Sequence, residues 1–295
     1  MRVLKKVIRK KLIHRWNIGF IEGDVNIMLR QKTWNIRWLK HSYKDRWFAD
    51  PFILSITDSE IEVLVEEFYD PIDRGRISKL IIDKNSYQLK KCIPILELDT
   101  HLSFPVIFQR DNEIYIYPES SRSQQLVLYR YHRETETVES VKVLSHQPLT
   151  DATITTLFGS PYLFSTSMPE PNKNILHIYR ADEWDGNYVL EQTVKFQDNT
   201  ARNAGEIFKI GNRLIRPAQD CNDAYGHGII FQEVFFQEGE FSFQELIRYY
   251  PTSWRYNLGM HTFNIKENIA VVDGRGYRNP VFGHFIDKIR KILHV

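Results

Sequence analysis

FADPFILSITDSEIEVLVEEFYD (residues 48–70) contains two short apolar segments that are separated by polar residues. The first segment, FADPFILS (48–55), begins beside an acidic residue, and the second, EVLVEEFYD (62–70), ends in polar residues. Segments of this length that are rich in β-branched and aromatic residues predict β-strands, and the polar stretch between them predicts a turn. The unit is therefore expected to be an antiparallel pair of strands.

The same unit recurs along the chain. The later first strands are LSFPVIFQ (102–109), TDATITTLF (150–158), NAGEIFKI (203–210) and GMHTFNIK (259–266). The later second strands are NEIYIYPESS (112–121), SPYLFSTS (160–167), NRLIRPAQDC (212–221) and NIAVVDG (268–274). Further apolar strands follow, such as ISKLIID (77–83) and LVLYRYH (126–132). Four short strands in a repeat of roughly 50 residues are typical of a propeller blade, so the sequence predicts an all-β, five-bladed β-propeller.

The fifth repeat ends soon after Gly274, before it has supplied four strands. We expect a strand near residues 17–30 to complete it, because closing the ring in this way removes free sheet edges. A β-sandwich or two separate β-domains are the alternative arrangements. No linker rich in Pro, Gly or Ser supports a division of the chain.

Both ends of the chain show helical spacing of apolar residues among lysines and arginines, at residues 3–13 and 284–295. This pattern predicts short basic amphipathic helices over 1–16 and 281–295, on either side of a propeller over 17–280. Such helices either pack on the propeller wall or lie on an anionic membrane surface.

The composition excludes several classes of protein. A net charge of +2 argues against a nucleic-acid partner. Cys92 and Cys221 show no metal-binding spacing, which indicates reduced thiols in a reducing compartment. No apolar run is long enough to span a membrane, and the basic N-terminus lacks the features of a secretory signal. We therefore expect a cytoplasmic protein, free or attached peripherally at the inner membrane face.

The propeller geometry gathers scattered polar residues into one candidate site. If the first strand of each blade lines the central channel, the residues at its mouth are Asp50, Ser103, Asp151, Asn203 and His261. The candidate catalytic residues are Asp50, Asp151 and Glu119, because paired carboxylates suit acid/base work on glycosidic bonds. The candidate substrate-binding residues are Arg202, Asn203, Arg216, Gln219, Asp220, His261, Asn264, Asp273 and His101.

Other chemistry has no signal in the sequence. Phosphate-loop, GxSxG and GxGxxG motifs are absent, and the possible metal ligands have no metal spacing. We therefore expect no cofactor and assign no metal ligands, although His261, Asp50, Asp151 and Asp220 are residue types that can bind a metal. Pro51 favours an extended backbone at Asp50, which would hold that carboxylate at the start of its strand.

The order of the motifs resembles a known family. FADPF (48–52), HLSFPVIF (101–108), DNEIYIYPES (111–120), DATI (151–154), ARNAGEIF (201–208), RLIRPAQDC (213–221), YG (225–226), GMHTFN (259–264) and VVDG (271–274) carry the resemblance. Together they resemble the N-terminal propeller domain of plant glucosamine inositolphosphorylceramide transferases and its bacterial relatives, over roughly residues 45–275. That domain is similar to the five-bladed arabinofuranosidase and levansucrase superfamily, which includes the family-43 glycoside hydrolases. The resemblance implies a role in surface-polysaccharide or glycolipid synthesis.

The resemblance also implies roles for single residues. Asp50 matches the general base of the hydrolases, whereas Phe104-Pro105 stands where they have an Asp-Pro. The glutamate that serves them as general acid has no counterpart at Asn203-Ala204-Gly205, so Asp151 or Glu119 would have to replace it. The preferred hypothesis is a glycosyl-transferring enzyme that acts on a saccharide or lipid-linked saccharide. The alternatives are a glycoside hydrolase with a rearranged acid/base pair and a non-catalytic glycan-binding module.

Overall fold

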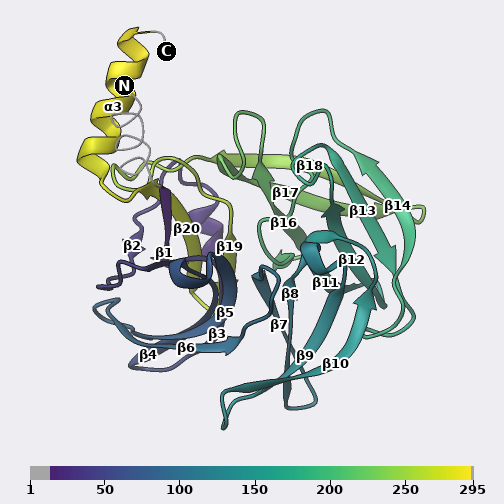
Figure 1. Cartoon of the computed structure of the whole chain (residues 1–295). Coiled ribbons are helices and arrows are strands. Elements are labelled where there is room, and N and C mark those ends of the chain that lie inside the picture. The colour runs from purple at the N-terminus through teal and green to yellow at the C-terminus, as the bar shows by residue number, and fades with distance from the viewer. Residues whose placement is uncertain (1–13, 294–295) are drawn as a thin grey trace.

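Short antiparallel strands make up most of the chain in the computed structural model, which describes residues 14–293. Within these residues they form five four-stranded sheets (Figure 1). Four sheets use consecutive strands: β3 (Arg46–Ile56), β4 (Glu60–Tyr69), β5 (Arg74–Asp83) and β6 (Leu89–Leu96); β7 (Ser103–Arg110), β8 (Glu113–Glu119), β9 (Leu126–His132) and β10 (Thr137–Ser145); β11 (Leu149–Leu157), β12 (Ser160–Ser167), β13 (Ile175–Arg180) and β14 (Val189–Lys195); β15 (Phe208–Ile210), β16 (Arg213–Asp220), β17 (Gly228–Gln237) and β18 (Glu240–Tyr249). We call these sheets blades 1 to 4.

Blade 5 joins the two ends of the described chain. Its strands follow the order β19 (Phe263–Lys266), β20 (Ile269–Tyr277), β1 (His14–Glu22) and β2 (Arg37–Trp38). The expected closing strand near 17–30 is thus present as β1, although it ends at Glu22 and a short helix, α2 (Val25–Met28), follows. β1 pairs with β20 over its whole length. These backbone hydrogen bonds join the two ends of the described chain, close the ring and leave β20 without a free edge.

The apolar core lies between neighbouring blades. The structure contains a hydrophobic cluster at each of the five blade junctions formed by the described residues. At the junction of blades 5 and 1, for example, Ile18 and Val271 pack with Val63 and Leu80. Because every blade buries both of its faces against neighbours, the sheets form a ring, and the five-bladed all-β fold is confirmed.

The innermost strands of blades 1, 2 and 3 share a β-bulge at the same place. The pairing shifts between Ala49 and Phe52, between Ser103 and Val106, and between Thr150 and Thr153. The first bulged residues are Asp50, Phe104 and Asp151, whose φ angles are 48°, 46° and 45°, so the extended backbone expected at Asp50 before Pro51 is wrong. Residues with a Cβ seldom adopt this left-handed backbone, so the bulges set these three side chains apart from regular strand positions. Phe104, and not the expected Ser103, therefore occupies the equivalent position in blade 2.

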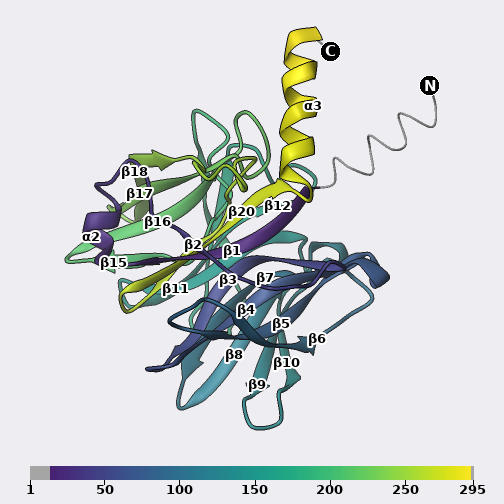
Figure 2. The same cartoon turned by 90° about the vertical axis from the view of Figure 1, so that its left-hand side faces the viewer.

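Helix α3 (Pro280–Leu293) follows blade 5 and extends away from the sheets (Figures 1 and 2). It is the helix expected over 281–295. Val281 and Phe285 on it are 74% and 59% exposed, and the basic amphipathic character of the two ends stays a prediction. Of the expected N-terminal helix, residues 1–13 lie outside the described residues, and residues 14–16 belong to β1. The remaining short elements are the 3-10 turns η1 (Asp70–Ile72) and η2 (Ser121–Ser123).

Neither cysteine forms a disulfide, and both belong to blades: Cys92 is half-buried in β6 and Cys221 is buried just after β16. Among the described helices, none combines the length and the apolar character that crossing a membrane requires.

Candidate functional site

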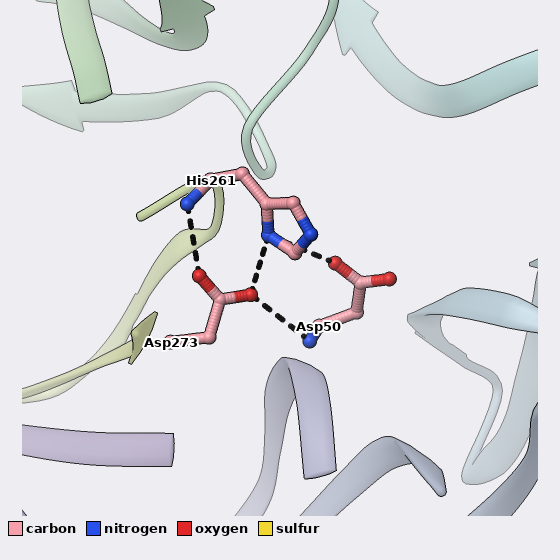
Figure 3. A group of neighbouring side chains, drawn as sticks. All are labelled: Asp50, His261 and Asp273. Carbon is pink, nitrogen blue, oxygen red and sulfur yellow. Dashed lines mark hydrogen bonds and ion pairs between the residues drawn. The ribbon is translucent and has the colours of Figure 1, made fainter. Parts of the chain in front are cut away.

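Two acidic residues and a histidine meet where blade 5 joins blade 1. His261 Nδ1 lies 2.5 Å from Asp273 Oδ2 and 3.6 Å from Asp50 Oδ1 (Figure 3). Asp273 also accepts hydrogen bonds from the backbone N–H groups of His261 (2.9 Å) and Asp50 (3.2 Å). The carboxylate of Asp273 therefore fixes the bulge of blade 1 and the histidine of blade 5 together. We call Asp50, His261 and Asp273 the triad.

The groups around the triad hold it rigidly. Asp50 accepts hydrogen bonds from the Thr262 hydroxyl at 2.7 Å and from the Phe104 backbone N–H at 3.1 Å. The ring of Trp16 stacks on the ring of His261 with centroids 4.0 Å apart. On the other side Gly226 approaches so closely that a Cβ there would lie 2.8 Å from that of His261. The backbone of Gly226 also has φ +59°, a second reason for glycine at this position.

A second cluster joins blades 2, 3 and 4. Arg202 donates from Nε to Asp151 at 2.6 Å, and its Nη2 lies 3.5 Å from Glu119. Gln219 donates to the same Asp151 oxygen at 2.7 Å. Glu119 in turn accepts a hydrogen bond from the backbone N–H of Asp151 at 2.9 Å. We call Glu119, Asp151 and Arg202 the arginine cluster.

Tyr225 lies between the two groups. Its ring is 5.2 Å from the ring of His261, and the guanidinium carbon of Arg202 lies 4.9 Å from its centroid. Tyr225 remains 36% exposed, so its ring is open on one side. An open aromatic ring next to buried carboxylates and a guanidinium is a surface on which a sugar ring can stack.

Burial controls the protonation of the carboxyl groups. Burial raises the pKa of Glu119 to about 8, and the neighbouring Asp151 adds to this although Arg202 opposes it. Burial also raises the pKa of Asp50 to about 7, against the opposing effect of His261. For His261, burial by itself would lower the pKa, but Asp273 and Asp50 raise it to about 9. The site thus holds a cationic imidazole beside carboxyl groups that change protonation near neutral pH.

Several predicted residues act inside the protein instead of facing the site. Arg216 is fully buried and donates to Asn203 Oδ1, to Gln232 Oε1 and to the carbonyl of Ala201. Asn203 donates to the carbonyls of Asp151 and Phe164, both at 2.8 Å. Arg216 is therefore not free to bind substrate as predicted, since its donors are used within blade 4, where it holds the Asn203 that contacts blade 3.

The other predicted binding residues also make structural contacts. Asp220 accepts from Arg248, Tyr250 and Asn222 near the outer strand of blade 4. Asn264 donates to the carbonyl of Pro51 at 2.9 Å and links blade 5 to blade 1. His101 lies 3.1 Å from Glu66 of β4 and accepts from the backbone of Gly75 of β5, so it contacts blade 1.

The residues that sequence reasoning missed are Trp16, Tyr225 and Thr262. Trp16 lies inside the helix expected over 1–16 but belongs to β1. Tyr225 lies in the loop between β16 and β17, where the YG pair and its left-handed glycine are a turn signal that could have drawn attention to it. Thr262 adjoins a predicted residue, His261.

The triad also has the composition of a metal site, because each member offers a ligand atom and these atoms lie within 4.8 Å of one another. In the arrangement seen, however, the facing oxygens of Asp50 and Asp273 already accept hydrogen bonds from protein donors. Hydrogen bonds and ion pairs therefore hold the triad together in this arrangement.

Comparison with known proteins agrees with this architecture. The sequence profile of the family described as "Glucosamine inositolphosphorylceramide transferase 1, N-terminal" matches residues 37–274. The transferase of that name from Arabidopsis thaliana is 30% identical over 193 residues, which are 59% of this chain and 25% of that protein. The one from Oryza sativa subsp. japonica is 30% identical over 138 residues, 44% of this chain and 18% of that protein. The matched region is thus a quarter or less of these relatives.

Solved structures show the same fold. An exo-β-1,3-galactanase from Phanerochaete chrysosporium with β-1,3-galactotriose has a TM-score of 0.56 at 14% identity, covering 72% of this chain and 53% of that one. A GH43_1 enzyme from Xanthomonas citri complexed with xylose has a TM-score of 0.53 at 11% identity, covering 79% and 88%. At these identities the likeness extends to the fold alone.

Proposed function

Because the chain belongs to the family of the N-terminal domain of glucosamine inositolphosphorylceramide transferase 1, we propose that it transfers a glycosyl group in cell-surface polysaccharide or glycolipid synthesis. Its substrate in this proposal is a saccharide or a lipid-linked saccharide, bound over the triad and the arginine cluster. The names of the two plant relatives indicate glycolipid synthesis, and the two solved structures with a similar fold are glycoside hydrolases.

The observation that carries the proposal is the pair of strained, buried aspartates at equivalent bulges. Asp50 and Asp151 have φ angles of 48° and 45° and are 5% and 2% exposed. A left-handed backbone at a residue with a Cβ costs on the order of 1 kcal/mol and clusters at functional sites. Asp151 is also among the carboxylates that raise the pKa of Asp50, so the two share one electrostatic environment.

Glycosyl transfer needs a base and an acid, and in this proposal the triad supplies the base and the arginine cluster supplies the acid. Asp50, with a pKa near neutrality, takes the proton of the acceptor hydroxyl as that oxygen bonds to the sugar carbon. Glu119, protonated at neutral pH, gives its proton to the leaving oxygen as the old bond breaks. Arg202 and the cationic His261 stabilise negative charge that develops between these groups.

We also propose that the protein works at the cytoplasmic face of a membrane. Val281 and Phe285 are exposed on α3, which extends away from the sheets (Figure 2). Apolar side chains on a helix beside basic residues favour contact with an anionic lipid surface. A lipid-linked substrate would then reach the site from the surface on which the protein lies.

Single substitutions test the catalytic proposal. Asp50→Asn should reduce glycosyl transfer at least about a hundredfold while the fold is kept, because general acid–base catalysis contributes about that much or more. Asp151→Asn should also reduce transfer, because the Asp151 carboxylate positions Arg202. The assay incubates the purified chain with a panel of labelled nucleotide sugars and inositolphosphorylceramide, and parallel reactions with aryl glycosides detect hydrolysis. Asp182→Asn, an exposed loop residue of blade 3, is the control and should retain full activity.

The outcomes separate the alternatives. Release of free sugar from aryl glycosides, lost in the Asp50 and Asp151 variants, would identify a hydrolase instead of a transferase. Saccharide binding without turnover in the wild type would reject both enzymes and leave a glycan-binding module.

A further inference from the structure

A cavity of about 630 Å³ lies beside the triad, at the junction of blade 5, blade 1 and the start of α3. Its walls come from β1, the segment that leads into β3, the loop before β19 and the residues just after β20. The volume is within the range of about 300–1,000 Å³ that small-molecule sites occupy. We call it the basic cavity, because its lining includes the cations Arg15, Lys44, Arg46, Arg255 and Arg278 and none of the acidic residues.

The cations divide into two groups. Arg15 and Arg46 each form an ion pair with a carboxylate that compensates their charge. Arg15 pairs with Asp70 at 2.5 Å, and Arg46 pairs with Glu67 at 2.7 Å. Lys44, Arg255 and Arg278 form no ion pair with a carboxylate of the described residues, and all three are exposed. Three uncompensated charges around one hollow create a positive potential that an anion would relieve.

Buried polar atoms in the same walls also lack partners. Asn17 is only 3% exposed, and its Oδ1 has no hydrogen-bond partner, although its Nδ2 donates to Leu39 and Tyr256. The buried Nδ1 of His41 also has no partner. Unpaired buried polar atoms are rare because each costs about 1–3 kcal/mol, but these two atoms are too deeply buried to contact a ligand in the cavity, so the exposed cations carry the recognition.

The electrostatics of His41 agree with a positive cavity. Burial lowers the pKa of His41, and the charges of Arg255 and Arg46 lower it further. The ring is therefore neutral at physiological pH and adds no positive charge of its own. Trp16, Trp47, Tyr43 and Tyr256 add aromatic surface to the lining.

We propose that the basic cavity binds the phosphate group of a phosphorylated saccharide or lipid, with Lys44, Arg255 and Arg278 as its cationic contacts. The role of this phosphate rests on the proposed function. Trp16 connects the two sites, because it lines the cavity and also stacks on His261 of the triad. Phosphate held here leaves the sugar end of the same molecule within reach of the triad. Asn279 lines the cavity and also the hollow at the foot of α3, so the cavity continues toward the exposed apolar residues of that helix.

Direct binding of phosphate tests the site without any need for turnover. We would titrate the purified full chain with inorganic phosphate by ³¹P NMR, and with phosphatidylcholine vesicles that contain or lack phosphatidic acid by co-sedimentation. The double variant Lys44→Gln/Arg255→Gln should weaken binding at least about tenfold, since charge-assisted hydrogen bonds to phosphate are strong. Lys142→Gln/Lys195→Gln, which removes two exposed cations of β10 and β14, is the matched control and should bind as the wild type does.

Two results support the proposal and identify the source of the phosphate. Binding of inorganic phosphate that the double variant loses indicates a soluble phosphorylated ligand. Preference for phosphatidic acid vesicles without binding of free phosphate, again lost only in the double variant, indicates a lipid headgroup. Equal binding by the double variant and its control, or binding by neither probe, overturns the proposal. Asp50→Asn should keep phosphate binding, so a failure of the catalytic proposal would leave this test intact.

Discussion

Replacing Glu119 by glutamine should change how the stability of the protein depends on pH. Glu119 accepts from the backbone of Asp151 at 2.9 Å and from the Ser121 hydroxyl at 3.1 Å. Glutamine can keep the first contact through its amide oxygen and reverse the second, with its NH2 donating to the Ser121 oxygen. Burial, with the neighbouring Asp151, raises the pKa of this carboxyl from 4.5 to about 8 on folding. Glutamine resembles the protonated acid and cannot ionise, so it removes this titration and little else.

The sign and the size follow from proton linkage. A carboxyl group whose pKa rises on folding stabilises the native state below pH 4.5, and this contribution is lost as the pH rises through about 8. Each pH unit in that window corresponds to about 1.4 kcal/mol, so the full loss is at most about 5 kcal/mol. The variant should match the wild type below about pH 4 and gain up to about 5 kcal/mol relative to it at about pH 9.

Urea unfolding at a series of pH values measures this difference in free energy. Glu113→Gln is the control, because Glu113 begins the same strand β8 that Glu119 ends, and its side chain is 47% exposed. A difference between Glu119→Gln and the wild type that stays constant from acid to alkaline pH would refute the reasoning. It would mean that Glu119 is not a buried acid in the folded protein.

Two further predictions concern the triad and α3. Asp273→Asn should cost about 3–5 kcal/mol in the free energy of unfolding, because it leaves the buried imidazolium without its main counter-charge, and it should lower the pKa of His261 from about 9. Urea unfolding and an NMR titration of His261 measure the two effects, and an unchanged pKa would contradict the triad. Val281→Ser/Phe285→Ser should reduce sedimentation with anionic vesicles, whereas Val189→Ser/Leu190→Ser, which changes residues of similar exposure on β14, should not. Equal sedimentation of both double variants would reject membrane contact through α3.

The sequence predicted the blades well, because a strand pair is a local structure. The apolar segments at 48–55 and 62–70 carry their own pairing information, and the repeat of roughly 50 residues indicates how many such units the chain holds. The same local signals nominated Asp50 and Asp151, since an acidic residue just inside an apolar strand is conspicuous wherever it occurs. The positions of these residues at bulges, with left-handed backbone, were not predictable from the pattern.

The sequence could not decide which polar residues face the site. Arg216 lies within β16 and Arg202 lies before β15 of the same blade, yet Arg216 is fully buried inside the sheet and Arg202 reaches Asp151 across a blade boundary. The alternation of side chains along a strand shows which residues share a face of the sheet. Whether that face is buried depends on how the neighbouring blade packs against it.

Taken by itself, the sequence determined the all-β repeat, the number of blades and the acidic residues that begin their inner strands, because each of these is written within a few dozen residues. Only the tertiary structure decided the partners. Asp50 meets Asp273 across 223 positions, and Trp16 from β1 stacks on His261 in the loop before β19. These contacts exist because β1 pairs with β20 to close the ring, and the free energy of that closure comes from apolar packing between blades that no local pattern records.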